Sequence, residues 1–258
     1  MATRKGKVIT IFSTKGGVGK TILTLNLAGI YSMLNKKVLI IDLDLYSGGI
    51  AVSLNVDPSN DIYKLVDDLD NGRYTEFKDY VSKYNENIDV LSCPLDPRQG
   101  NKINRNYAEI ILVNAANRYD VVLVDTAHIL SDINLTALDK TDDILLVLSN
   151  DPIDLKNMKS IIAIFKDSEI DNYRIVLNEA INTDKDFFTT FDIKNIIRAN
   201  IDYTISKQFH MHDIDRYIAN GKIPVLDKKI QARKKRDIEK LKKMATRLLV
   251  RKDGDKHE

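Results

Sequence analysis

The stretch Ser13-Thr14-Lys15-Gly16-Gly17-Val18-Gly19-Lys20-Thr21 decides the fold. An apolar run over residues 8–12 leads into it, and a helix-like run over residues 22–30 follows it. A strand, a glycine-rich turn and a Lys-Thr pair that opens a helix wrap backbone N–H groups around a nucleoside phosphate. The motif arises by chance in roughly one of 10⁴ sequences. The sequence therefore predicts a phosphate loop that binds a nucleotide.

The predicted nucleotide-binding residues run through the loop into the helix: Lys15, Gly16, Gly17, Val18, Gly19, Lys20, Thr21 and Ile22. The glycines let the backbone approach the anion, and the helix N-terminus adds a favourable dipole potential. Lys20 is expected against the β- and γ-phosphates, and the Thr21 hydroxyl as a ligand of Mg²⁺. The loop departs from the general pattern twice, with Thr14 where glycine is usual and with an additional lysine at Lys15.

The sequence Lys-Gly-Gly-Val-Gly-Lys-Thr at residues 15–21 resembles the deviant phosphate loop of the ParA/MinD family of ATPases. In that family the first lysine, here Lys15, reaches across a dimer interface to the phosphates of the partner. The resemblance implies ATP and Mg²⁺ as cofactors and a homodimer that forms on ATP. It also implies slow hydrolysis that depends on Lys15 and Lys20 and is stimulated by a partner protein.

Two carboxylates, Asp42 and Asp44, stand at the end of the apolar run 38–42. Ligands of open α/β sheets bind at the carboxyl ends of the strands, so both acids are expected to face the ligand. One can hold the Mg²⁺ shell, and the other can orient or deprotonate the attacking water. A solvated strand end with two ordinary acids is the alternative. The ParA/MinD resemblance implies the metal role for Asp42 and the catalytic, water-orienting role for Asp44.

A third carboxylate, Asp125, ends the apolar run 121–124. An acid in this place holds Mg²⁺ through water in phosphate-loop NTPases. Relatives continue with Asp-x-Pro-Pro, whereas this chain continues with Thr126-Ala127-His128. His128 either approaches the γ-phosphate or faces solvent, and a solvent-facing loop histidine is the commoner case.

Asn178 follows the predicted strand Arg174–Leu177. The Leu-Asn pair matches the pair whose Asn recognises adenine in the ParA/MinD family. An Asn side chain offers a donor and an acceptor, which suits adenine. A turn-forming Asn after a strand is the alternative.

Composition describes an ordinary soluble globule, with 258 residues, 43% apolar and 29% charged. The one cysteine excludes a disulfide framework and a multi-cysteine metal site. No apolar run approaches the roughly 18 residues of a membrane span. We therefore expect a cytoplasmic protein, with possible recruitment to a cell pole, the nucleoid or a membrane surface.

Strand-length apolar runs alternate with helix-length amphipathic segments, which predicts a mostly parallel, twisted sheet flanked by helices on both faces. We expect one α/β phosphate-loop NTPase domain over residues 1–252 and a disordered tail at 253–258. The predicted strands are Lys7–Ser13, Val38–Asp42, Ile88–Ser92, Asp120–Asp125, Ile144–Leu148, Arg174–Leu177 and Ile201–Ile205. The predicted helices are Thr21–Asn35, two short helices within 60–83, Tyr107–Asn117, Ile153–Phe165, Ile193–Ala199, Ile214–Ala219 and Lys229–Val250. Residues 93–104 are expected to form a loop.

The segment Asp42–Leu54 is similar to the pattern Asp-Leu-Asp-Leu-x-x-Gly-x-x-Ala-x-x-Leu of CpaE/TadZ proteins. These are ParA/MinD-type ATPases that help localise tight-adherence pilus machinery at a cell pole. Partition ATPases more often read Asp-x-Asp-Pro-Gln in this place. The resemblance implies a switch that positions a pilus or secretion machine. The alternatives are a ParA-type partition ATPase and a nucleotide-bound scaffold that hardly hydrolyses.

The C-terminal segment is strongly basic, because residues 228–252 hold twelve Lys or Arg against two acids. Ile238, Leu241, Ala245 and Leu248 form one apolar stripe, which is expected to pack on the domain. A solvated basic face is the first interpretation of the remaining residues. Non-specific DNA binding through phosphates is the second. Binding to a membrane surface, as in MinD, is the third, because the stripe lacks Phe and Trp.

Overall fold

A computed structural model describes residues 6–181 and 187–250. They form an eight-stranded sheet in the order β3-β4-β2-β5-β1-β6-β7-β8, in which only β3 and β4 pair antiparallel. The strands are β1 (Lys7–Phe12), β2 (Val38–Leu43), β3 (Ser82–Lys83), β4 (Ile88–Leu91), β5 (Val121–Thr126), β6 (Asp143–Leu148), β7 (Tyr173–Asn178) and β8 (Tyr203–Ile205). The prediction of a mostly parallel sheet is confirmed.

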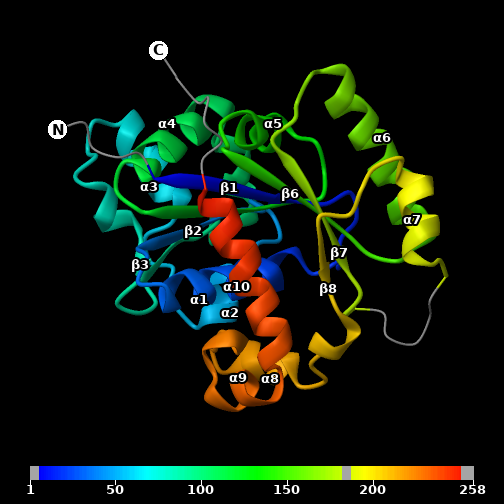
Figure 1. The fold of residues 1–258 in the computed structure, drawn as a ribbon. Helices are drawn as coiled ribbons and strands as arrows, with labels where there is room; N and C mark the ends of the chain where they lie inside the picture. The colour runs from blue at the N-terminus through cyan, green and yellow to red at the C-terminus, as the bar shows by residue number, and fades with distance from the viewer. Residues whose placement is uncertain (1–5, 182–186, 251–258) are drawn as a thin grey trace.

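The helices cover both faces of the sheet (Figure 1). The α-helices are α1 (Lys20–Met33), α2 (Ile50–Leu54), α3 (Ile62–Asp70), α4 (Arg105–Ala116), α5 (Asp132–Asp139), α6 (Pro152–Asp167), α7 (Thr190–Ile197), α8 (Ile214–Ala219), α9 (Lys228–Arg233) and α10 (Lys235–Leu249). Four 3₁₀ turns complete the described chain: η1 (Phe77–Tyr80), η2 (Pro97–Lys102), η3 (Lys207–Phe209) and η4 (Pro224–Leu226).

Alternation along the central strands sets the two layers, because successive side chains of a strand point to opposite faces. Leu123 of β5 belongs to the cluster that contains α1 and α10. Its neighbours Val122 and Val124 belong to the cluster that contains α3 and α4. A third cluster joins β6 and β7 to α6 and α7. These strands are buried on both faces, which explains their unbroken apolar sequence.

The prediction of a single helix over Lys229–Val250 is wrong, because the helix is interrupted at Lys234, between α9 and α10. Lys234 leaves the helical region, with φ −114° and ψ 26°. Its ammonium group donates to the backbone carbonyls of Gln208 and His210. The turn lets Gln231 of α9 bond to the Val225 carbonyl while α10 packs beside α1. The apolar stripe predicted for α10 is confirmed as core.

Short elements account for the remaining differences. The helices α2 and α5 and the strand β3 are not among the predicted elements, and η2 lies within the predicted loop 93–104. The five-residue α2 and eight-residue α5 are too short to show a clear periodic pattern. The predicted tail 253–258 lies outside the described residues. Within the described part of the chain, no helix is both long enough and apolar enough to cross a membrane.

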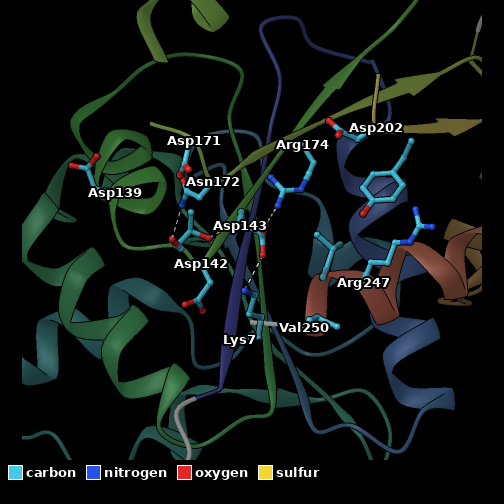
Figure 2. A pocket seen from close by; sticks show the side chains of 13 residues that line it. Lys7, Asp139, Asp142, Asp143, Asp171, Asn172, Arg174, Asp202, Arg247 and Val250 are labelled. Carbon is cyan, nitrogen blue, oxygen red and sulfur yellow. Dashed lines mark hydrogen bonds and ion pairs between the residues drawn. The ribbon is translucent and has the colours of Figure 1, made fainter. Parts of the chain in front are cut away.

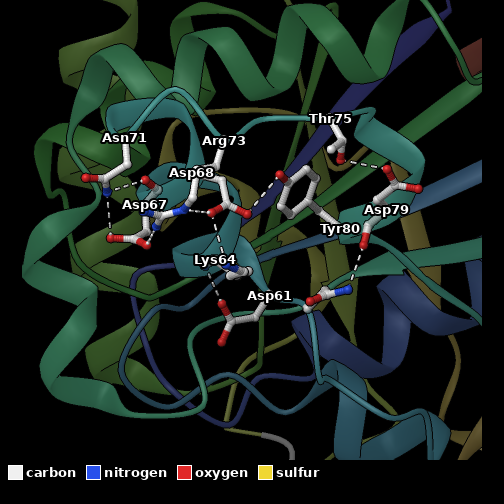
Figure 3. A network of polar contacts seen from close by, with 10 residues as sticks. Asp61, Lys64, Asp67, Asp68, Asn71, Arg73, Thr75, Asp79 and Tyr80 are labelled. Atoms are coloured by element: carbon white, nitrogen blue, oxygen red, sulfur yellow. Dashed lines mark hydrogen bonds and ion pairs between the residues drawn. The ribbon is translucent and has the colours of Figure 1, made fainter.

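A polar network joins α3, the turn that follows it and η1 (Figure 3). The buried carboxylate of Asp68 accepts from Lys64, Arg73 and Tyr80. At the start of α3, the Asp61 carboxylate accepts from the backbone N–H groups of Lys64 and Leu95. The Asp68 charge is paired with Lys64 and Arg73, and the Asp61 bond to Leu95 joins α3 to the chain after β4.

Candidate nucleotide-binding site

The phosphate loop joins the end of β1 to the start of α1, at the edge where the parallel strands end. Gly17 and Gly19 have φ of +76° and +91°, a region that favours glycine. A Cβ at Gly19 would lie 2.5 Å from Nδ2 of Asn178. The α1 N-cap makes no side-chain cap bond, so backbone N–H groups of the first turn are available to an anion.

Lys20 lies over the inside of the loop. Its Nζ donates to Oγ of Ser13 at 2.9 Å, and that hydroxyl donates to the Lys15 carbonyl at 2.8 Å. Burial lowers the pKa of Lys20, while the carboxylates of Asp125 and Asp44 act in the opposite direction. The lysine therefore sits among the acids predicted to share its site.

Asp125 and Thr21 are brought together as predicted. The Thr21 hydroxyl donates to Oδ2 of Asp125 at 2.6 Å, and the Thr24 hydroxyl donates to Oδ1 at 3.2 Å. Asp42 stands directly opposite Asp125 in the β2–β5 pairing. Burial raises the pKa of Asp125 to about 6, against the two hydroxyl donors and Lys20.

Asp42 is fully buried, and its carboxylate accepts from the backbone N–H groups of Asp44 and Ile50. Gly48 closes over it, because a Cβ there would lie 2.5 Å from the carboxylate and 2.6 Å from Sγ of Cys93. Burial, and then the charge of Asp125, raise the pKa of Asp42 to about 8. A cation would relieve the repulsion between these two acids.

Asp44 is half-buried just beyond the end of β2, where its carboxylate accepts from the Ser47 N–H group at 3.2 Å. The oxygen groups gathered here that could serve as metal ligands are the Thr21 hydroxyl and the carboxylates of Asp42 and Asp125. Within residues 6–181 and 187–250, no group of three His, Cys, Asp or Glu could hold a metal ion. The set fits Mg²⁺, which takes one or two carboxylates and completes its shell with phosphates and water.

Asn178 ends β7 beside the loop. Its Nδ2 donates to the Val18 carbonyl at 3.0 Å, and its Oδ1 accepts from the Ala180 N–H group at 3.1 Å. A pocket of about 460 Å³ adjoins it and also touches Thr21 and Ile22. Much of its lining is apolar, including Ile181, Ile205, Phe209, Met211, Ile214 and Ile218. The pocket offers an apolar surface to a planar base next to the phosphate loop.

A second pocket, of about 580 Å³, is larger than the one beside Asn178 and lies away from this site (Figure 2). Two of its basic residues share one carboxylate: Nζ of Lys7 lies 2.9 Å from Oδ2 of Asp143, and the Arg174 guanidinium lies 3.7 Å from Oδ1. Asp142 accepts from the Val8 N–H group. This pocket contains none of the predicted site residues, whereas the pocket beside Asn178 is also lined by Gly19, Lys20 and Thr21.

Comparison with known proteins agrees with this geometry. The AAA_31 family model, described as an AAA domain, matches residues 6–183. The chain belongs to this family, of the ParA/MinD type. Among curated relatives, the antiactivator FleN of Pseudomonas aeruginosa is 24% identical over 67% of this chain and 62% of FleN. The chain spans less than two thirds of the length of the curated relatives it matches.

Solved structures of ParA and MinD proteins share the fold. A ParA family ATPase from Chlorobium tepidum aligns with a TM-score of 0.80 at 20% identity, over 93% of this chain and 98% of that one. The MinD protein of Pyrococcus horikoshii, solved with Mg-ADP, aligns with a TM-score of 0.74 at 19% identity, over 94% and 96%. The phosphate-loop NTPase fold of this ParA/MinD-type chain is thereby confirmed.

The N-cap and the first turn of α6 each contribute one residue that sequence reasoning missed in this ParA/MinD-type site. Lys15 pairs with Asp151 at 2.9 Å, and this contact lowers the pKa of Asp151. Buried Asp154 accepts from the hydroxyl of Thr14 at 3.0 Å. An Asp before Pro152 signals the start of a helix, and so predicts a cap. It does not reveal that the helix begins beside the phosphate loop.

His128 is exposed and lies next to the loop. A Cβ on Gly16 would be 3.8 Å from Nδ1 of His128. Both interpretations of this histidine therefore keep their geometric basis, since it is exposed and also borders residues that are predicted to bind phosphate.

Proposed function

We propose that the chain is a Mg²⁺-dependent ATPase that dimerises on ATP and dissociates after slow hydrolysis. The observation that carries this proposal is the meeting of Lys20, Thr21 and Asp125 with Asp42 at the carboxyl ends of β1, β2 and β5. The Lys20 cation and three oxygen-bearing side chains around a glycine loop suit phosphoryl transfer to water.

The residues divide the work. The N–H groups from Gly16 to Thr21 bind the phosphates, and Lys20 neutralises the charge on the β- and γ-phosphates. Thr21, Asp42 and Asp125 would hold Mg²⁺, which when bound supplies further positive charge to the phosphate oxygens. Asp44, less buried than Asp42, orients the attacking water. Asn178 and the adjoining pocket receive adenine.

Dimerisation rests on Lys15 and on the surface around it. Lys15 is 38% exposed, although it pairs with Asp151. Large apolar side chains stand exposed after several strands on this edge: Tyr46, Val52, Ile129, Leu130 and Ile153. A second copy would cover them, which is a common reason for exposed apolar groups to gather. Lys15 of one subunit then reaches the phosphates bound by the other.

The nucleotide state would be read by a cargo or an activating protein. A MinC:MinD complex from Aquifex aeolicus has been solved, so a protein of this fold binds another protein. The Asp42–Leu54 segment supports a CpaE/TadZ-like cargo, a pilus or secretion machine. Its spacing has a physical role here, because Gly48 closes over Asp42 and Ala51 and Leu54 are buried.

DNA binding is a second candidate, favoured by α10. Its apolar stripe is buried, while Lys235, Arg236, Lys240, Lys243 and Arg247 are exposed. Such a face can neutralise DNA phosphates without disturbing the core. Membrane binding is less supported, because the apolar side of α10 is already used for packing.

Size-exclusion chromatography with light scattering tests the switch, using ATP and ADP. The wild type should dimerise with ATP only. Asp44→Ala should lower hydrolysis by roughly 10²-fold or more and accumulate the ATP dimer. Lys15→Ala should bind ATP as a monomer. A monomeric Asp44→Ala protein, or an unaffected dimer of Lys15→Ala, would contradict the mechanism. Phosphate release without any dimer would show that the chain is an ATPase but does not dimerise on ATP.

A further inference from the structure

We propose that Asp154 is a positioning residue of the ATPase, which acts through Thr14 to fix the base of the phosphate loop. This inference rests on the proposed function for its kinetic consequences. Its structural basis is independent: the Thr14 hydroxyl donates to Oδ1 of Asp154 at 3.0 Å, across 140 residues of sequence. Thr14 occupies the position where the general phosphate-loop pattern has glycine, so the hydroxyl is an addition to that pattern.

The Asp154 carboxylate is not spent on capping its own helix. Asp151 is the N-cap of α6 and accepts from the N–H groups of Ile153 and Asp154. In a capping box, the third residue of the helix would reach back to the N–H group of the cap. Asp154 holds that third position, yet its Oδ2 accepts from the N–H and hydroxyl groups of Ser149, at 2.7 and 3.0 Å.

Burying the Asp154 carboxylate costs desolvation free energy, which suggests that the residue has a role in holding the loop. Asp154 has no exposed surface, and burial raises its pKa. A buried carboxylate needs several hydrogen bonds to offset its desolvation, and three donors meet it here. An apolar residue of similar size would fill the space without this cost. The Asp154 charge also opposes, after Asp125 and Asp44, the lowering of the Lys20 pKa by burial.

Two consecutive loop residues are thus held by carboxylates one turn apart on α6. Thr14 is bonded to Asp154, and Lys15 is paired with Asp151. In the proposed dimer Lys15 must leave Asp151 for the phosphates of the other subunit. The Thr14–Asp154 bond stays within the chain, so it can serve as the fixed point about which Lys15 changes partner. Losing it should misplace Lys15 and leave the N–H cradle of residues 16–21 in place.

The decisive variant is Thr14→Val, which keeps the shape of the side chain and removes the donor. It should lower the ATP turnover rate by roughly ten- to a hundredfold, the cost of a small misplacement of a catalytic group. ADP affinity should stay within about twofold of the wild type, because the cradle is retained. Thr14→Ser, which restores a hydroxyl, should recover most of the rate. Ser149→Ala is the matched control, since it removes a donor to the other oxygen of Asp154.

A second measurement does not depend on turnover. Hydrogen–deuterium exchange over residues 13–21 of the nucleotide-free protein should be faster in Thr14→Val than in Thr14→Ser. Equal exchange, or equal rates for Val and Ser at position 14, would overturn the role of Asp154. So would a loss of ADP affinity as large as the loss of rate, since that marks a general collapse of the loop. A wild-type protein without ATP turnover contradicts the proposed function instead, and the exchange data still judge Asp154.

Discussion

Two regions of the molecule are rich in charge. One is the C-terminal helix α10, and the other is the nucleotide edge, by which we mean residues 13–21 together with Asp42, Asp125 and Asp154. They differ in whether the charged side chains are buried or exposed. At the nucleotide edge Asp42, Asp125 and Asp154 are buried, and each accepts hydrogen bonds from nearby donors. On α10 the apolar side is buried, and basic residues such as Lys240 and Lys243 are exposed. Burial shifts the pKa of Asp42 and Asp125 upward, to about 8 and about 6.

The difference teaches how to interpret charge in this fold. A buried charge is costly, and it is tolerated where it prepares a site for a charged ligand. An exposed charge on a helix costs little, so its presence alone does not reveal a ligand. Function is therefore better supported at the nucleotide edge than on α10, although α10 holds more basic residues.

Replacing a charge at the nucleotide edge should give the largest effect. Lys20→Met should lower ATP hydrolysis by roughly 10²- to 10³-fold, because the cation that stabilises the transferring phosphate is lost. The unfolding temperature should not fall, since burial already disfavours the charged form of Lys20. Phosphate release and calorimetry measure the two quantities on one sample.

Lys235→Met is the matched control from α10, because Lys235 is exposed on its first turn. It should hydrolyse ATP at the wild-type rate. If both variants lose activity equally, the contrast between the two regions is wrong, and net charge rather than burial controls turnover.

Removing core contacts of α10 should give the second largest effect, on the free energy of unfolding. Ile238 is 3% exposed within the cluster that joins α10 to α1. Ile238→Ala should lower the free energy of unfolding by about 2–4 kcal/mol, through lost burial and a cavity. Urea denaturation measures it, with exposed Thr246→Ala as the control. An unchanged midpoint would mean that α10 is not part of the cooperative core.

Much of the fold could be predicted because its strands are long, apolar and buried on both faces. The predicted strands Asp120–Asp125 and Ile144–Leu148 lie within one residue of β5 and β6, and their apolar composition was sufficient to predict them. The break at Lys234 could not be predicted, because local sequence there favours one helix. It depends on carbonyl groups of the chain near Gln208 and His210, which tertiary structure alone brings to the lysine.

The same division holds at the site. The grouping of Thr21 with Asp125 follows from a motif whose spacing reflects its chemistry. The contacts of Lys15 with Asp151 and of Thr14 with Asp154 join residues about 140 positions apart. No periodicity or spacing connects such pairs, because the order β1-β6 in the sheet places α6 beside the loop. The sequence feature that could have pointed to these contacts is a departure from the motif, such as Thr14 in place of glycine.

The smallest expected effect on stability belongs to the exposed face of α10. The double variant Lys240→Ala/Lys243→Ala should change the free energy of unfolding by less than about 0.5 kcal/mol. If this face binds duplex DNA of random sequence, the slope of log K against log salt should shrink by about two. Lys102→Ala/Lys159→Ala, which removes the same charge from exposed positions elsewhere, should leave the slope unchanged.

An equal change in both double variants would trace DNA binding to net charge, and no binding at low salt would exclude the DNA candidate. A slope that responds only at Lys240 and Lys243 would show that the exposed charge of α10 binds DNA phosphates at a defined face of the molecule, without any buried charge.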